Sequence, residues 1–498
     1  PTAIGARTDN RPDFPQGSLE KQDQDAEVGL TARWGMTPNL TLNLTGNPDF
    51  SQVEADAWQL DINQPFALFY PERRPFYTEG ADFFSALESI IYTRMMRDPT
   101  WGLKLTGKER THTIGAYVVR DRLTNLIFPG SQGSSSTSVD QANTSSVFRY
   151  KKDFGRRYTV GLLATDREGK DYYNRVYGFD LDFRFTRTNQ IQLLVLGSKT
   201  RYPDEVASDY GQPSGSFSSG LISFEYDHNS RTWGWWADYE EAGPGFRADL
   251  GYYPRVGYRN AEGGLNYRWN APPNSWWSLF MVGSEVNYFE DQDGNLLNRG
   301  ASLWFAYNGT MQSSLFIRGW RTREGYNSRL FDQTYFSIEG GFWPTSNLML
   351  LMSTVFGDQI DYENTRLGKR FRLTPYLTYN LGKHLRLSLA HTYERMTVQD
   401  ARLYTANILQ STAIYQFNVR TFFRAIIQYV DYDYNVSKYT FEKDPKYRRF
   451  FTQLLFSYKI NARTLLFLGY SDNYFGGQEF GLTQSDRTLF VKLGYAWV

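Results

Sequence analysis

The sequence predicts an all-β protein, a transmembrane antiparallel β-barrel of about 24 strands (an even number in the range of about 20–26). Three observations predict it: long segments of alternating apolar and polar residues, short turns that alternate with longer links, and an aromatic content of 17%. The mean hydropathy is only −0.53, so the apolar residues are dispersed among polar ones. No run of 18 apolar residues occurs, which excludes a transmembrane helix.

Alternation is clearest in the last segment of the chain. Leu489, Val491 and Leu493 fall on one face, and Phe490 and Lys492 fall on the other. Successive strand residues point to opposite faces of a sheet, so one face is apolar and the other is mixed. Other segments are longer than most globular strands and can cross a bilayer at a tilt, for example 274–289, 384–397 and 419–434.

Turn lengths alternate along the second half of the chain. Tight turns are predicted at Asn461-Ala462, Phe417-Asn418, Gly382-Lys383, Thr345-Ser346, Asn308-Gly309 and Pro272-Pro273. Longer polar links are predicted at 474–484, 435–446, 398–401, 358–366, 325–330 and 290–295. Outer-membrane barrels have short periplasmic turns and longer extracellular loops. An even strand number then places both termini in the periplasm.

The end of the chain carries a candidate assembly signal, made of Lys492, Gly494, Tyr495 and Trp497. These residues resemble the polar–glycine–aromatic terminal strand that the barrel-assembly machinery recognises. We therefore expect this machinery, outer-membrane lipid and lipopolysaccharide as partners, and the bacterial outer membrane as the location. A periplasmic or outer-membrane protein partner is a further expectation.

Composition excludes several other classes. The chain has no cysteine, which excludes disulfide scaffolds and thiolate chemistry, and its net charge of +1 shows no nucleic-acid footprint. Residues 1–24 are polar and predict a periplasmic linker, followed by the barrel over 25–498. The Gly- and Ser-rich stretch 122–142 predicts a mobile extracellular loop.

Residues 47–88 break the alternating pattern. They mix prolines, aromatic residues and both charge signs too densely for a lipid-facing strand. A long segment without periodicity is usually functional. We predict that it is inserted into the lumen as a plug-like segment.

Three runs within this region resemble one bacterial family. They are Asp-Phe-Ser-Gln-Val-Glu-Ala-Asp at 49–56, Tyr-Pro-Glu-Arg-Arg-Pro-Phe-Tyr-Thr-Glu-Gly-Ala-Asp at 70–82 and Trp-Gly-Leu-Lys-Leu-Thr-Gly at 101–107. The family is an outer-membrane barrel domain of unknown function (DUF5916) that usually follows a carbohydrate-binding family 9-like domain. The resemblance implies such a domain upstream and brings no catalytic residues.

The polar residues of this segment are the candidate lumen or ligand-binding residues: Asp49, Gln52, Glu54, Asp56, Asp61, Glu72, Arg73, Arg74, Glu79 and Asp82. In one interpretation they bind a polar ligand, since an arginine can grip a carboxylate in bidentate fashion. In the other they pair with charges of the inner wall and anchor the segment, because an isolated buried charge is costly. The sequence favours the second interpretation.

No catalytic or metal-binding constellation has a credible spacing. The four histidines are scattered, and Asp291-Gln292-Asp293-Gly294-Asn295 is better explained as a turn than as a calcium loop. We expect no cofactor and no metal, and the sequence favours a protein that is not an enzyme. The predicted function is a plugged pore or conduit for a polar ligand or a partner protein. The alternative is a membrane-embedded enzyme or a binding platform for surface glycans or lipids.

Overall fold

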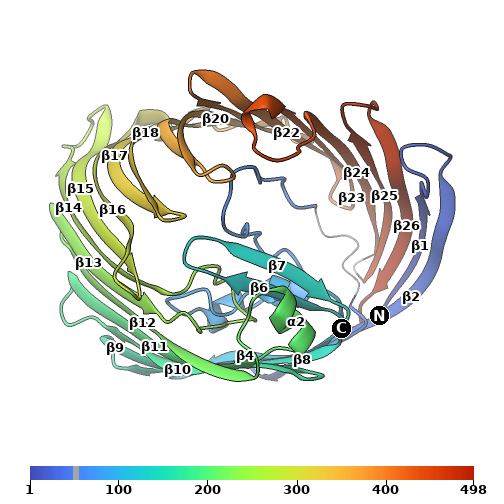
Figure 1. The fold of residues 1–498 in the computed structure, drawn as a ribbon. Helices are drawn as coiled ribbons and strands as arrows, with labels where there is room; N and C mark the ends of the chain where they lie inside the picture. The colour runs from blue at the N-terminus through green and yellow to red at the C-terminus, as the bar shows by residue number, and fades with distance from the viewer. Residues whose placement is uncertain (49–54, 462, 498) are drawn as a thin grey trace.

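The strands form one closed ring. The computed structural model describes residues 1–48, 55–461 and 463–497. A sheet of 24 strands is antiparallel throughout, and the first strand pairs with the last, which closes the barrel. Figure 1 looks down the axis of this ring. The predicted fold class is confirmed, including its strand number.

The barrel strands follow one another around the ring. The first part consists of β1 (Thr2–Asn10), β2 (Glu20–Thr37), β3 (Leu40–Gly46), β4 (Pro99–Glu109), β5 (His112–Asp121), β8 (Asn143–Phe154), β9 (Tyr158–Gly169), β10 (Tyr172–Phe183), β11 (Asn189–Arg201), β12 (Ser216–Asn229), β13 (Trp233–Ala242) and β14 (Tyr258–Asn270). The second part consists of β15 (Trp277–Asp291), β16 (Leu296–Gly309), β17 (Ser314–Tyr326), β18 (Arg329–Thr345), β19 (Leu348–Asp361), β20 (Arg366–Leu381), β21 (Leu385–Val398), β22 (Ala401–Asn418), β23 (Thr421–Tyr434), β24 (Lys446–Asn461), β25 (Thr464–Gly476) and β26 (Thr483–Tyr495).

The remaining elements are short. A two-stranded sheet pairs β6 (Thr124–Pro129) with β7 (Ser134–Val139). Two α-helices are α1 (Pro75–Thr78) and α2 (Asp204–Asp209), and four 3₁₀ turns cover Ala81–Phe84, Thr93–Met95, Thr310–Gln312 and Val436–Lys438. No helix in the described ranges is long and apolar enough to cross a membrane.

Large apolar side chains are exposed on the outside of the barrel, and several charged side chains are buried inside it. Val28 and Leu303 are each 71% exposed, whereas Arg149 and Arg167 are fully buried. An extensive apolar outer surface of this kind is unfavourable in water and favourable in lipid. The fold is therefore that of an outer-membrane-type transmembrane barrel.

The faces predicted for the last strand are those observed. Leu489, Val491 and Leu493 point outwards and are 51%, 52% and 45% exposed, while Lys492 points inwards and is 2% exposed. The neighbouring strand continues the same faces, because Leu466 and Leu468 lie directly opposite Leu493 and Val491. Period-two alternation therefore predicted the lipid face correctly here.

Residues 1–24 are not a linker, which corrects the prediction. β1 lies in the barrel wall between β26 and β2, with Thr2 opposite Gly494 on one side and Gly29 on the other. Its outward positions include Ala3 and Gly5, which are too small to give an apolar pattern. Backbone pairing on both edges fixes the strand, and that pairing leaves no local sequence signal.

The links between strands are less regular than predicted. The expected longer links at 325–330 and 398–401 are two-residue turns at 327–328 and 399–400. All four residues of these turns have positive φ, between 47° and 60°, as type I′ hairpin turns require. Other predicted links are real loops, for example 435–445 between β23 and β24.

The stretch 122–142 is an ordered hairpin, not a mobile loop. Leu126 and Phe128 of β6 are 2% and 3% exposed and pack with Tyr202 and with Val206 of α2. Figure 1 shows β6 and β7 inside the outline of the ring. The apolar residues of β6 hold the hairpin in place, and the serines of β7 had suggested mobility.

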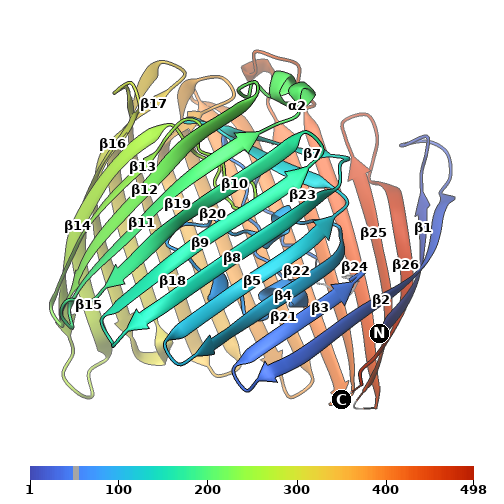
Figure 2. The same ribbon diagram turned by 90° about the horizontal axis from the view of Figure 1, so that it is seen from below.

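Both chain ends lie at the same end of the barrel, since Thr2 is paired with Gly494 near the end of β26. Figure 2 shows the strands at a tilt, with the C-terminus at the lower rim. That this rim faces the periplasm stays a prediction.

Candidate functional site in the barrel lumen

Besides the β6–β7 hairpin, two segments leave the wall and enter the lumen (Figure 1). We call residues 55–98, between β3 and β4, the lumenal segment, and residues 243–257, between β13 and β14, the inner loop. The lumenal segment reaches the inner wall on distant strands. The side-chain amide of Gln428 donates to the carbonyl of Asp56 at 2.8 Å, and the Tyr432 hydroxyl donates to the Asp61 carboxylate at 2.9 Å.

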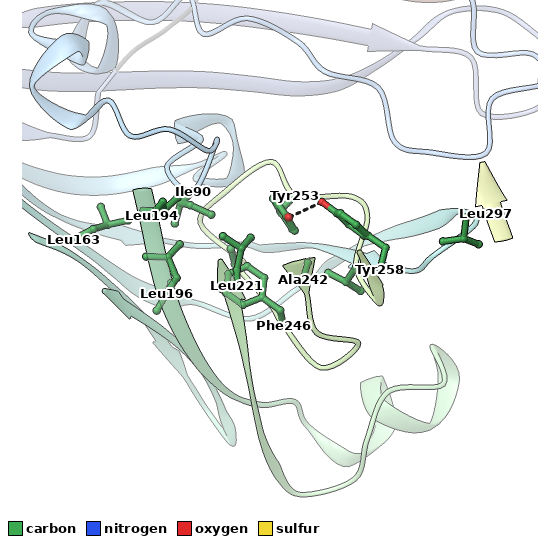
Figure 3. Close-up of a cluster of buried hydrophobic side chains, with 13 residues drawn as sticks. Ile90, Leu163, Leu194, Leu196, Leu221, Ala242, Phe246, Tyr253, Tyr258 and Leu297 are labelled. Atoms are coloured by element: carbon green, nitrogen blue, oxygen red, sulfur yellow. Dashed lines mark hydrogen bonds between the residues drawn. The ribbon is translucent and has the colours of Figure 1, made fainter. Parts of the chain in front are cut away.

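The two segments bind each other through backbone and apolar contacts. The Tyr92 amide donates to the Leu250 carbonyl at 2.6 Å, and the Tyr252 amide donates to the Ser89 carbonyl at 2.8 Å. Ile90 and Phe246, both fully buried, belong to one apolar cluster on the inner wall (Figure 3). The inner loop therefore holds one end of the lumenal segment against the barrel.

Glu72 and Arg74 form a closed clamp within the lumenal segment. The guanidinium of Arg74 donates to both oxygens of the Glu72 carboxylate, at 2.8 and 2.6 Å. It also donates to the carbonyls of Met96 and Thr93, at 2.6 and 2.8 Å. These contacts fasten the start of α1, in the middle of the segment, to the 3₁₀ turn near its end.

The electrostatics of the clamp agree with this structural role. Burial acts to raise the pKa of Glu72, but the hydrogen bonds from Arg74 outweigh it and hold the pKa below its usual value. The Thr93 hydroxyl donates to the same carboxylate at 2.7 Å. A carboxylate whose oxygens are already occupied has little capacity left for a ligand.

The other described candidates do not form one site. Asp56 forms ion pairs with Arg73, at 3.5 Å, and with Arg94, whereas Asp61 accepts the hydrogen bond from Tyr432 described above. Glu79 forms an exposed ion pair with Arg33 of β2 at 3.6 Å. Asp82 lines a separate polar cavity of 610 Å³. The candidates Asp49, Gln52 and Glu54 lie outside the described residues.

The candidate assembly residues occupy the last strand and its end. Lys492 faces the lumen, Tyr495 and Trp497 are 40% and 74% exposed, and Gly494 pairs with Leu465 of β25. An exposed aromatic pair at the end of the last strand fits the predicted signal. Its recognition by an assembly machinery stays a prediction.

The inner loop carries a buried network that the sequence interpretation missed. The hydroxyls of Tyr172 and Tyr202 donate to the Asp249 carboxylate at 2.7 and 3.0 Å, and Arg167 donates to the Asp249 carbonyl at 3.1 Å. Burial raises the pKa of Asp249. The network ties the inner loop to β9 and β10. Its Gly- and Pro-containing sequence gave no sign that it enters the lumen.

A row of carboxylates crosses three neighbouring strands of the inner wall. Glu225 of β12 lies directly opposite Asp238 of β13, and Asp238 lies directly opposite Glu262 of β14. Directly opposed residues have Cβ atoms about 4.5–5.5 Å apart, and like charges at such positions are destabilising. Among the described residues none of the three forms an ion pair. We call these three residues the carboxylate row.

More carboxylates surround the row. Glu240 follows Asp238 on the same face of β13, and Glu285 of β15 forms an ion pair with Arg318 at 2.5 Å. Glu88 of the lumenal segment faces this wall. Burial and the nearby carboxylates of Glu240 and Glu225 raise the pKa of Glu88 to about 7.

Another sector of the wall has the opposite charge. Four arginines lie on the inward face of their strands: Arg370 and Arg372 of β20, Arg424 of β23 and Arg449 of β24. The lumen is therefore electrostatically asymmetric. Within the described ranges no group of histidine and carboxylate side chains has an arrangement that could hold a metal ion. Two acidic residues at alternate positions on β12, and two on β13, were the available sequence signal for this wall.

Residues 14–115 match the family described as Domain of unknown function (DUF5916). The match includes the three runs that carry the resemblance, so the resemblance is confirmed over this part of the chain. An upstream carbohydrate-binding domain stays a prediction. No curated protein matches the sequence.

Several solved structures resemble 80% of this chain. The siderophore receptor PirA from Acinetobacter baumannii has 8% identity and a TM-score of 0.42, with 80% of this chain and 85% of that chain covered. PirA from Pseudomonas aeruginosa has 9% identity and a TM-score of 0.44, covering 80% and 87%. The copper transporter OprC has 10% identity and a TM-score of 0.40, covering 80% and 78%. Similarity at this level says nothing about a ligand.

Proposed function

We propose that the protein is an outer-membrane conduit for a polar, positively charged ligand, and that the lumenal segment regulates passage. The carboxylate row carries the proposal. Three like charges in direct register cost stability, and a cation that passes or binds at this wall would offset that cost.

The lumenal segment supports the regulatory part. The residues that flank it lie side by side, because the Asn47 amide donates to the Thr100 carbonyl at 2.7 Å. The segment is therefore an excursion from an otherwise continuous pairing of β3 with β4. It can be removed without breaking the wall.

Conductance in planar bilayers tests the conduit. We expect the intact chain to conduct little, and a variant with residues 49–96 replaced by two glycines to conduct in large, steady steps. Circular dichroism and heat-modifiable mobility on gels control for folding. If the folded deletion variant conducts no more than the intact chain, the conduit proposal is wrong.

Ion selectivity tests the role of the carboxylate row in the same deletion background. A salt gradient should give a reversal potential that favours cations. The triple substitution Glu225→Gln, Asp238→Asn and Glu262→Gln should reduce that preference at least severalfold. The matched control is Asp166→Asn, since Asp166 faces outwards on β9. Unchanged selectivity in the triple variant would refute the role of the carboxylate row in cation preference. It would not contradict the proposal that the barrel is a conduit.

A further inference from the structure

One stretch of the barrel wall has a free edge. Residues 20–29 of β2 pair with β1, and residues 30–37 pair with β3. β3 has seven residues and ends at Gly46, whereas β2 has eighteen. Among the described residues, none pairs with the β3-side edge of β2 from Glu20 to Glu27. Figure 2 shows the β1–β2 hairpin standing apart from the ends of β4 and β5.

Side-chain contacts show which backbone groups face this edge. Thr2 of β1 donates to the Gly29 carbonyl at 3.3 Å, and the Asn47 side chain donates to the Val28 carbonyl at 3.4 Å from the other side. Neighbouring residues in a strand direct their backbone groups to opposite edges. Ala26 and Gln24 therefore face the free edge, as Val28 does.

The free edge is open on both faces. Every residue from Glu20 to Val28 is exposed, including Asp25 and Glu27, which point towards the lumen. The Gln24 amide donates to the neighbouring Asp23 carboxylate at 2.8 Å. The backbone groups of Ala26 point to the same edge as the Val28 carbonyl, two residues further on. The edge can therefore accept another strand.

The charge of this edge has one sign. Glu20, Asp23, Asp25 and Glu27 carry four negative charges, and Lys21 carries one positive charge, so the net charge is −3 over nine residues. Charged residues protect sheet edges from indiscriminate pairing. Here they also determine which strand can bind, because a neutral or acidic strand would leave the charges of Asp23, Asp25 and Glu27 uncompensated on one face. A basic strand would neutralise them.

We propose that the edge Glu20–Val28 binds an extended, basic segment of a second protein by β-strand addition. Main-chain hydrogen bonds to Ala26 and to the Gln24 carbonyl would supply affinity, and basic side chains at alternate positions would supply specificity. A second copy of this chain is a poor occupant, since it would bring the same net charge of −3. The inference is independent of the conduit proposal.

Synthetic peptides test the proposal on the full chain in detergent micelles. The probe is an end-blocked nonapeptide of alternating lysine and valine. The comparison peptides are a glutamate–valine nonapeptide and a lysine–valine nonapeptide with two central prolines, which removes ladder donors. We expect saturable binding of the first peptide alone, by fluorescence anisotropy, with slower hydrogen exchange over residues 20–28.

Charge variants test whether the peptide binds to the carboxylates of this edge or is attracted to the negative charge of the protein in general. The triple substitution Asp23→Asn, Asp25→Asn and Glu27→Gln should weaken binding about tenfold or more, since each charge-assisted contact is strong. The matched control removes three outward carboxylates elsewhere: Asp166→Asn, Glu168→Gln and Asp332→Asn. Equal weakening by both triple variants would overturn the proposal, as would equal binding of the proline peptide. Slow exchange over residues 20–28 without peptide would show that the edge is already covered, and would also overturn it.

Discussion

Charged residues serve different purposes at the two places in the lumen where they are densest. At the Glu72–Arg74 clamp the opposite charges touch, and backbone carbonyls occupy the remaining donors. At the carboxylate row the charges have one sign and lie in direct register. The clamp is electrostatically complete, whereas the row requires a cation or a proton.

This difference shows where to look for function. The clamp lies in the most conspicuous sequence motif, and its polar atoms are used internally. The row lies on strands that no sequence motif distinguishes. None of its charges forms an ion pair with a residue that the structure describes. A dense charged motif therefore marks the anchor of the lumenal segment, and uncompensated charge marks the surface that can act on a ligand.

The largest expected effect is at the clamp. Arg74→Met leaves Glu72 buried without its main partner, and should destabilise the docked lumenal segment by about 3–5 kcal/mol. Hydrogen exchange of amides in residues 70–96 measures this. The double substitution Glu72→Gln and Arg74→Gln should cost less than the single one, because no charge is left alone. Equal or larger loss in the double variant would contradict the clamp interpretation.

The outer wall should give the next largest effect. Val491 is 52% exposed and lies midway between the outward Arg487 and Tyr495 on β26. Val491→Lys should reduce the free energy of unfolding in lipid vesicles by about 2–4 kcal/mol, because it places a charge in hydrocarbon. Thr488→Lys, which faces the lumen, should cost far less. Equal costs at the two positions would contradict the assignment of the lipid face.

Outward faces were predictable from the sequence only where large side chains repeat with period two. Leu489, Val491 and Leu493 signal their strand without any knowledge of its neighbours. β1 gives no such signal because Ala3 and Gly5 occupy its outward positions, and pairing with two distant strands places it in the wall. Local pattern therefore predicts a strand only when the strand displays its own lipid face.

The candidate site was predictable in part. The unusual composition of 47–88 correctly marked a segment whose described residues from Ala55 onwards are not part of the wall. Its chemistry was harder to predict, because the Glu72–Arg74 pair is completed by Thr93 and Met96, about twenty residues away. The carboxylate row depends on the register between three strands, and register cannot be deduced from each strand alone.

The pH dependence of docking distinguishes the two regions further. Glu88 is held against the acidic wall, and its pKa is raised to about 7. Its raised pKa means that the docked state binds the proton more tightly than the undocked one. The stabilisation is thus complete below about pH 4.5 and is lost as the pH rises through about 7, at a cost of about 2–3 kcal/mol.

Glu88→Gln should remove most of this dependence and keep the segment docked at pH 8. Hydrogen exchange over residues 85–92, compared at pH 5 and pH 8 after correction for intrinsic rates, measures it. The clamp should show no loss over the same interval, because the pKa of Glu72 is lowered. A pH dependence that persists in the Glu88→Gln variant would assign the effect to other carboxylates.

The smallest expected effect is at Glu79, which belongs to the same motif as Glu72. Its ion pair with Arg33 spans 3.6 Å, and the two side chains are 55% and 65% exposed. Exposed pairs contribute little, since water and salt screen them, so Arg33→Gln should change docking by less than about 1 kcal/mol. The exchange assay used for Arg74 measures it, at low and high salt. The docked segment could instead lose as much stability as it does in Arg74→Met. Membership of the motif would then decide which charges hold the segment, and burial with satisfied hydrogen bonds would not.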